Sequence, residues 1–287
     1  MKVLIVGANG QLGTTLVQTA PAAVDWEAVD LPECDITHGE AVDALVAAKQ
    51  PDVVINAAAY TAVDRAEEAV AAAFAVNATG AKNLAVAVKK RGMRLIHVST
   101  DYVFDGTACR PYPPQAPCRP IGVYGRSKRE GEVHILELID DPVIIRTAWL
   151  YSSYGSNFVL TMLRLMRERD HIQVVSDQVG APTWAMTLAR AIWSMVQKPH
   201  LKGIYHWCDA GVASWYDFAV AIQEEAIQIG HLKQAIPIRP IPSEAYPTAA
   251  HRPAYSLLNC QASWHDLGLE PLHWRVALRQ MLRTIQS

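Results

Sequence analysis

Short apolar runs alternate with amphipathic stretches through the first half of the chain. Each run is only a few residues long and lacks a polar face, which is typical of strands buried on both sides of a parallel sheet. The runs predict strands over residues 2–6, 24–29, 52–56, 94–98 and 142–146. Alternation of such strands with helices predicts an α/β fold built on a Rossmann-like doubly wound parallel sheet.

The amphipathic stretches between these runs predict the helices. Thr37 followed by Glu40 resembles a capping box, in which the two side chains bond the backbone at the start of a helix. Helices are expected from Leu12, over 37–49, over 62–91 with a break near Asn77-Ala78, and over 124–138.

The pattern is looser beyond Tyr151. Helices are predicted over 157–169, 185–197, 214–229 and 272–285, with a short strand over 203–207. Loops are predicted over 109–120 and 176–183, and the proline-rich stretch 236–254 is expected to be irregular. We expect residues 1–150 to form a dinucleotide-binding domain, to which some later segments return, and 151–287 to form mainly a smaller substrate-binding lobe.

Composition narrows the possible partners and location. The 287 residues are 51% hydrophobic, and 26 basic and 28 acidic side chains are mixed along the chain to a net charge of −2. No basic stripe indicates nucleic acid, and no apolar run approaches the ~18 residues of a membrane span. The apolar start, residues 1–6, is too short for a signal-peptide core. Five scattered cysteines without a Cys-x-x-Cys pair predict reduced thiols, a cytoplasmic location and no metal site.

A glycine-rich loop follows the first strand and opens the first helix. Gly7 is expected to make the tight turn, Gly10 to let the backbone approach a pyrophosphate, and Gly13 to let helix and strand pack closely. The alternative is a purely structural turn. Asp30 ends the second strand, where a carboxylate can bond an adenosine ribose and would repel a 2′-phosphate.

Tyr124 and Lys128 lie four residues apart, on one face of the predicted helix. A phenol loses its proton near pH 10, and a nearby ammonium lowers that pKa. The pair therefore predicts a proton donor for reducing a carbonyl or oxidising an alcohol. The alternative is a solvated helix face. Thr100 ends the fourth strand, where a hydroxyl could hold a substrate oxygen, although Ser99-Thr100-Asp101 could equally be a turn.

With the glycine loop, Asp30, Thr100 and Tyr124/Lys128 in this order, the chain resembles the extended short-chain dehydrogenase/reductases. Further stretches narrow the resemblance to the dTDP-4-dehydrorhamnose reductases, over nearly the whole chain. They are NAAAYTAVDRAE at 56–67, STDYVFDG at 99–106, DQVGAPT at 177–183 and RPAYSLLN at 252–259. Two positions depart from the family pattern at the helix entry: Gly122 replaces an Asn, and Arg129 replaces a Leu.

The resemblance implies roles at matching positions, and Arg252 is a candidate for the substrate diphosphate by charge and position. The implied catalytic set is Thr100, Tyr124 and Lys128. Sugar contacts would come from Thr100, Asp101, Tyr124 and Trp149. The implied cofactor-binding residues are Gly7, Gly10, Gln11, Leu12, Gly13, Asp30, Asp35, Ile36, Ala58, Ala59, Tyr60, Thr61, Val98, Tyr124 and Lys128.

The implied activity is reduction of the C4 carbonyl of dTDP-4-dehydro-L-rhamnose to dTDP-L-rhamnose by NADPH or NADH, in a possible homodimer. Asp30 favours NADH, whereas the family frequently prefers NADPH. One alternative is a nucleotide-sugar epimerase or dehydratase of the same superfamily, although Tyr102 stands where a dehydratase commonly has an acid. Another is a non-catalytic dinucleotide-binding subunit similar to the β subunit of methionine adenosyltransferase.

Overall fold

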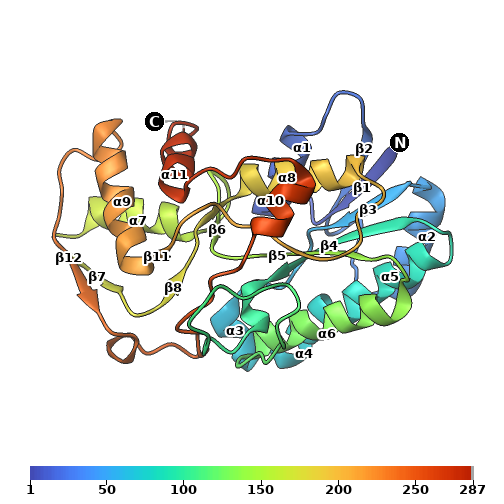
Figure 1. Ribbon diagram of the computed structural model, residues 1–287, viewed down its shortest axis with the longest axis horizontal. Helices are drawn as coiled ribbons and strands as arrows, with labels where there is room; N and C mark the ends of the chain where they lie inside the picture. Colours follow the sequence, from blue (N-terminus) through green and yellow to red (C-terminus); the bar gives the residue numbers. More distant parts are fainter. Residues whose placement is uncertain (286–287) are drawn as a thin grey trace.

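The computed structural model describes residues 1–285. A six-stranded sheet, all of whose neighbouring strands pair in parallel, forms one end of the molecule (Figure 1). Its order is β10-β5-β4-β3-β1-β2. The strands are β1 Lys2–Val6, β2 Asp25–Val29, β3 Val53–Asn56, β4 Arg94–Thr100, β5 Val143–Thr147 and β10 Gly203–His206. The α/β fold and each strand predicted for this sheet are confirmed, with boundaries shifted by one or two residues.

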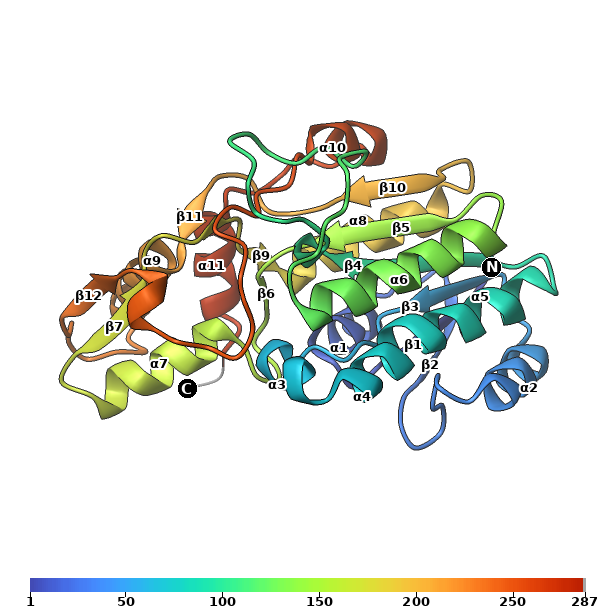
Figure 2. The same cartoon turned by 90° about the horizontal axis from the view of Figure 1, so that it is seen from below.

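Alternate residues of each strand face two different helical layers, as the pleat of a strand requires. One layer, with Ile5, Ile55 and Ile96 beneath it, contains α1 Gln11–Gln18, α8 Ala185–Gln197 and α10 Gln261–Leu267. The other layer lies over Leu4 and Val54 and contains α2 Gly39–Lys49, α5 Ala81–Lys89 and α6 Val123–Leu138 (Figure 2). The sheet is therefore covered on both faces, which explains why its strands read as continuous apolar runs.

The expected capping box at Thr37 is wrong. Helix α2 begins at Gly39, its N-cap residue is His38, and no side chain caps it. The Thr37 hydroxyl donates instead to Asp35 Oδ1, at 2.7 Å. That carboxylate also accepts from the Thr37 backbone N–H, so the local side-chain turn uses the hydroxyl that a cap would need.

The stretch predicted as one long helix is divided, as expected, near Asn77. It consists of α3 Val63–Glu68, α4 Val70–Phe74, a π-helical segment Ala75–Gly80 and α5. Residues Val70–Lys89 are long and apolar enough to cross a membrane by length and composition. In this structure, however, the C-terminal part of that stretch packs Leu84, Ala85 and Val88 in the core.

A smaller lobe lies at the other end of the molecule (Figures 1 and 2). Its core is formed mainly by α7 Phe158–Glu168, α9 Trp215–Gln228 and α11 Trp274–Leu282. Ser214 caps α9 in a complete capping box with Asp217. Three two-stranded sheets border this core: β6 Leu150–Tyr151 with β9 Thr183–Trp184, β7 Ile172–Val175 with β12 Ile238–Ile241, and β8 Val179–Gly180 with β11 Ala213–Ser214.

Two expectations for this half are corrected. The proline-rich stretch contains β12, which tolerates Pro240 because a two-stranded sheet leaves one edge of each strand unpaired. The loop predicted over 176–183 contains β8 and the start of β9. Helix α10 and strand β7 were not predicted.

Candidate active site

A cleft of about 730 Å³ opens at the carboxyl ends of the large sheet's strands. It is lined by the glycine loop, the segment after β3, the end of β4 and the start of α6. Every predicted site residue lines this cleft except Gly13 and Arg252. Residues more than a hundred positions apart are thus brought together where ligands bind in open parallel sheets.

Two glycines are required by close backbone approach. Gly7 has a φ of +87°, and a Cβ there would lie 2.4 Å from the Ala58 backbone nitrogen. A Cβ at Gly13 would lie 2.0 Å from the Gly7 carbonyl oxygen. Gly13 therefore packs helix α1 onto the loop without lining the cleft, and Gly10 is the N-cap residue of α1. The loop is compact enough for a dinucleotide's pyrophosphate to lie against its backbone.

Asp30 fastens this loop to the end of β2. Its carboxylate accepts from the Asn9 and Leu31 backbone N–H groups, each at 2.7 Å. Asp35 also lines the cleft, and its bonds to Thr37 hold the pKa of its carboxyl below the usual range. Both carboxylates have structural bonds and still face the cleft, so a role in holding an adenosine stays a prediction.

The π-helical segment fixes the cofactor side of the cleft. The buried Asn77 side chain accepts from the Tyr60 N–H at 2.9 Å, and it donates to the Tyr60 carbonyl at 3.1 Å and to Ser127 Oγ at 3.0 Å. Asn77 thereby ties the segment after β3 to helix α6. Its role could not be read from the sequence, because both partners are far from it along the chain.

The entry to α6 is held in place without the family's usual asparagine. The Val123 backbone N–H donates to Glu67 Oε1 at 2.7 Å. Gly122, the N-cap residue, leaves room for that carboxylate, since a Cβ there would lie 2.9 Å from the same oxygen. Arg129, the second departure, pairs with Glu132 at 2.8 Å. The structure therefore accommodates both departures from the family pattern.

Tyr124 and Thr100 meet in the cleft. Burial raises the pKa of Tyr124 to about 12, and a hydrogen bond with the Thr100 side chain offsets part of that rise. We expected a lowered pKa from the Lys128 ammonium, and this expectation is wrong for the free protein. The phenol is removed from water, which penalises the phenolate more than its neighbours stabilise it. Tyr124 is therefore a neutral donor at physiological pH.

Lys128 lines the cleft one turn further along α6. Its ammonium donates to the Val98 carbonyl at 2.7 Å and lies 3.4 Å from His97 Nε2. Burial lowers the pKa of Lys128 to about 8, with the Glu132 carboxylate acting in the opposite direction. The charged form thus predominates only below about pH 8.

His97 is a buried neighbour of Lys128 that the sequence did not reveal. Burial and the Lys128 charge lower its pKa well below the usual value, so the imidazole is neutral. Asn56 Oδ1 accepts from the Ala58 N–H at 3.1 Å, which orients the amide so that Nδ2 donates to His97 Nδ1 at 3.0 Å.

A buried ion pair anchors α6 to the sheet. Arg146 Nε and Nη2 each donate to Glu132 at 2.7 Å, in a bidentate arrangement. Glu132 is four residues beyond Lys128, on the same helix face. This pair fixes the helix that carries Tyr124 and Lys128 against β5.

Asp101 is a buried acid beside Thr100. Thr100 Oγ1 donates to Asp101 Oδ1 at 3.0 Å, while Asp101 Oδ2 is buried without a hydrogen-bond partner within residues 1–285. Burial raises the pKa of Asp101 to about 6. Asp101 lines the cleft beside Thr100, so a role in holding the sugar stays a prediction.

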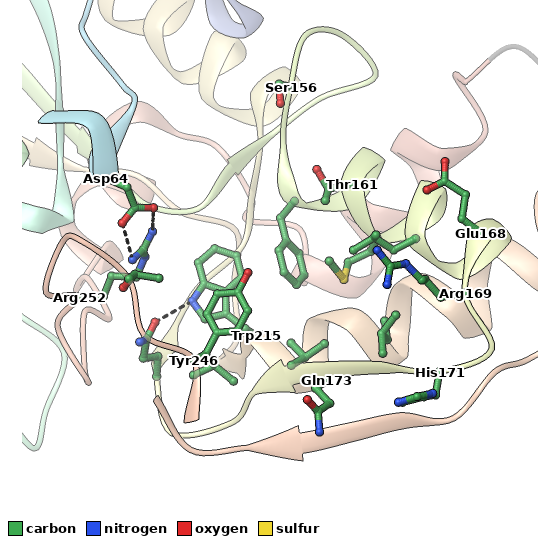
Figure 3. A pocket seen from close by; sticks show the side chains of 18 of the residues that line it. Asp64, Ser156, Thr161, Glu168, Arg169, His171, Gln173, Trp215, Tyr246 and Arg252 are labelled. Atoms are coloured by element: carbon green, nitrogen blue, oxygen red, sulfur yellow. Dashed lines mark hydrogen bonds and ion pairs between the residues drawn. The ribbon is translucent and has the colours of Figure 1, made fainter. Parts of the chain in front are cut away.

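Arg252 lines a second cavity of about 1050 Å³, which lies in the lobe (Figure 3). Its guanidinium bonds both oxygens of Asp64, at 3.1 and 2.7 Å, and holds the pKa of that carboxyl below its usual range. Asp64 belongs to α3, so the pair joins the sheet domain to the lobe. Ser156 lines both the cleft and the cavity, which therefore adjoin.

The part of the chain that the structure describes contains no group of three or more His, Cys, Asp or Glu side chains placed to hold a metal ion. All five cysteines lie in this part and are free.

Comparisons with known proteins agree with this architecture. The family model described as "RmlD substrate binding domain" matches residues 1–287. A dTDP-4-dehydrorhamnose reductase of Aggregatibacter actinomycetemcomitans is 40% identical, over 98% of each chain. A dTDP-4-keto-6-deoxy-D-glucose reductase of Streptomyces niveus is 41% identical, over 96% of this chain and 95% of that protein.

A solved structure is similarly close. The dTDP-4-dehydrorhamnose reductase of Bacillus anthracis strain Ames, determined in complex with NADP, superposes with a TM-score of 0.92 at 36% identity, over 98% of each chain. The resemblance seen in the sequence motifs is thus confirmed over the full length. This chain belongs to the dTDP-4-dehydrorhamnose reductase family.

Proposed function

We propose that the protein reduces the C4 carbonyl of dTDP-4-dehydro-L-rhamnose to give dTDP-L-rhamnose, with NADPH or NADH as the reductant. The observation that supports this most directly is the meeting of Thr100, Tyr124 and Lys128 in the same cleft as the glycine loop. Full-length relatives named for this reaction support it independently. The glycine loop and the small side chains of Ala57–Ala59 leave room for a dinucleotide to lie close to the backbone.

Within this proposal the chain's own groups handle the proton and the developing charge. The reduced nicotinamide supplies the hydride to C4 when it is bound. Tyr124 gives its phenolic proton to the oxygen, which is favourable even with a pKa of about 12 because an alkoxide is a stronger base. Thr100 would add a second donor once its hydroxyl, which donates to Asp101 Oδ1 in the free protein, turned to that oxygen; donors placed in this way can contribute several kcal/mol. The Lys128 ammonium, which donates to the Val98 carbonyl in this structure, would hold the nicotinamide ribose and supply positive charge to the site below about pH 8.

We propose that the substrate spans the two adjoining spaces. The hexose would lie in the cleft beside Thr100, Asp101 and Trp149, and the nucleoside would lie in the lobe cavity. The diphosphate would then lie near Arg252, which lines the cavity and contacts Tyr102 of the cleft. In this arrangement the nucleoside would lie mainly against residues 151–287, whereas the hexose contacts come from residues 1–150.

Arg252→Met should raise the KM for the sugar nucleotide by about 10- to 100-fold, because a hydrogen bond to a charged group contributes about 1.5–3 kcal/mol. The KM for the cofactor should stay unchanged. Steady-state kinetics with each substrate varied in turn checks this. Lys202→Met is the control, since Lys202 pairs with Asp141 on the surface and neither residue lines the cleft or the cavity. An unchanged sugar-nucleotide KM in Arg252→Met would remove Arg252 from the diphosphate site.

Both cofactors should be used, with no more than about a tenfold preference, a difference of roughly 1.4 kcal/mol. Asp30 would repel a 2′-phosphate, yet its carboxylate already accepts two backbone N–H bonds. The Bacillus anthracis relative binds NADP. The ratio of kcat/KM for NADH and NADPH measures the preference, and a hundredfold ratio either way would contradict this prediction.

A second candidate substrate is favoured by one comparison. The relative from Streptomyces niveus is named as acting on dTDP-4-keto-6-deoxy-D-glucose. A coupled assay that supplies this sugar with and without a 3,5-epimerase separates the two. We expect oxidation of NAD(P)H only when the epimerase is present. Equal rates without it would assign the chain to the second substrate.

The same assay distinguishes a reductase from the other candidate functions, namely a superfamily epimerase or dehydratase and a non-catalytic subunit. A reductase consumes one cofactor for each sugar reduced, whereas an epimerase or dehydratase regenerates its cofactor. Tightly retained NAD with no net NADH consumption would contradict reduction. We also infer that the enzyme acts in the cytoplasm. We infer further that it forms a homodimer, and sedimentation of the purified chain would test this oligomeric state.

A further inference from the structure

Two tryptophans stack between the catalytic cleft and the lobe cavity. The rings of Trp149 and Trp215 have centroids 3.6 Å apart and an interplanar angle of 7°. Trp149 lines the cleft, whereas Trp215 lines the cavity (Figure 3 shows Trp215). The stack therefore forms part of the wall between the two spaces.

Trp149 has an unusual backbone. Its φ is +46°, a left-handed conformation that is rare and strained for a bulky residue. The strand pairing that follows holds it there: Thr183 N–H donates to the Trp149 carbonyl at 3.2 Å, and β6 pairs with β9. Strain kept in place by its surroundings is common at ligand sites.

Gly180 lies against the Trp149 ring. A Cβ at this position would be 2.7 Å from Cε2 and 2.9 Å from Nε1 of the indole. Gly180 is not among the glycines with positive φ, so its backbone conformation does not require glycine. Glycine is needed here instead because the Trp149 ring leaves no room for a side chain.

Trp215 is fixed in turn by groups of the lobe. Its Nε1 donates to Gln178 Oε1 at 3.2 Å, and Gln178 Nε2 donates to Ser243 Oγ at 2.9 Å. The Phe158 ring packs against the same indole, with centroids 4.7 Å apart. Trp149 is therefore in contact with a fixed ring, that of Trp215, and with the backbone at Gly180, and both restrict where its ring can lie.

We propose that Trp215 and Gly180 are positioning residues that hold the Trp149 ring at the hexose site, and so set where a nucleotide-linked 6-deoxyhexose places its C4 relative to Tyr124. The proposal rests on the proposed function, in which Trp149 contacts the sugar. Gly180 lines neither space, and the atoms nearest to a methyl group added there all belong to the Trp149 ring. Trp215 could also touch the substrate directly, so Gly180 gives the sharper test.

The test is a double-mutant cycle of Gly180→Ala with Trp149→Ala. In the wild-type background Gly180→Ala should raise the sugar-nucleotide KM at least about tenfold, or roughly 1.4 kcal/mol, and leave the cofactor KM within about twofold. In the Trp149→Ala background it should have no further effect, because the ring that the new methyl displaces is absent. An equal loss in both backgrounds, or no loss in either, would overturn the proposal.

A second double-mutant cycle, of Trp215 with Trp149, tests the proposal if Gly180→Ala does not fold. Trp215→Leu should raise the sugar-nucleotide KM in the wild-type background and have little effect with Trp149→Ala, while Trp215→Phe, which keeps a flat ring, should retain most of the affinity. A loss from Trp215→Leu that persists without Trp149 would mean direct substrate contact and overturn the positioning role.

Circular dichroism separates this inference from the proposed function, since it needs no substrate. Closely stacked indoles couple their transitions, so the wild type should show an exciton couplet that Trp149→Ala removes and Gly180→Ala changes. If the couplet behaved in this way but the protein reduced no 4-keto sugar, the proposed function would be refuted and the positioning of Trp149 would stand. A couplet unaltered by Gly180→Ala would refute the positioning of Trp149.

Discussion

Tyr124→Phe should lower kcat by at least ~10²-fold while the sugar nucleotide still binds. The substitution removes the phenolic proton and one contact to the reacting oxygen but keeps the ring, and general acid catalysis contributes about 10²–10⁴-fold. The KM for each substrate should change little, because the ring's packing against Tyr102, at 5.4 Å between centroids, is retained. Steady-state kinetics at saturating cofactor measures both constants.

Arg126→Ala is the matched control for this substitution. Arg126 lies two residues further along α6 and is exposed, so its loss should change kcat less than severalfold. A Tyr124→Phe enzyme within threefold of wild type would show that Tyr124 belongs to a structural helix face, and another proton donor would have to be sought.

Lys128→Met should be comparably damaging to kcat and should remove a limb from the pH profile. Burial lowers the pKa of Lys128 to about 8, so the ammonium is present below that pH and is lost above it. Wild-type kcat should therefore fall as the pH rises through about 8. The variant should be uniformly slow with no such limb, which a kcat profile from pH 6 to about 9.5 would detect.

The double variant of Tyr124 and Lys128 completes this prediction. Groups that act as one unit have non-additive effects, so it should be little slower than the slower single variant. Multiplied losses would indicate that the two side chains act independently. An alkaline limb that persisted in Lys128→Met would assign the titration to another group.

Much of the sheet domain could be predicted because its signals are local. The strand runs, the glycine loop and the Tyr124/Lys128 spacing each lie within a few residues, and parallel pairing then brings the strand ends together. The lobe was harder. Strands such as β7 and β12 are four residues long and pair only with each other, so neither carries a long periodic pattern.

The features that the sequence did not reveal depend on tertiary contact. His97 is an ordinary strand residue until Asn56 and Lys128 lie beside it, and Asp64 becomes a partner of Arg252 only once α3 meets the lobe. The expected lowering of the Tyr124 pKa was wrong for a related reason. The spacing reports that two side chains can meet, but it does not report how much water both lose on burial.

The central claim is that hydride moves from the cofactor to C4 of a dTDP-linked 4-keto sugar. It is tested most directly with NADPH that carries deuterium at the transferring position of the nicotinamide, in the assay coupled to the 3,5-epimerase. We predict one deuterium at C4 of the dTDP-L-rhamnose formed and one cofactor oxidised per sugar, measured by NMR and absorbance. Product without deuterium at C4, or sugar turnover without net cofactor oxidation, would contradict the account.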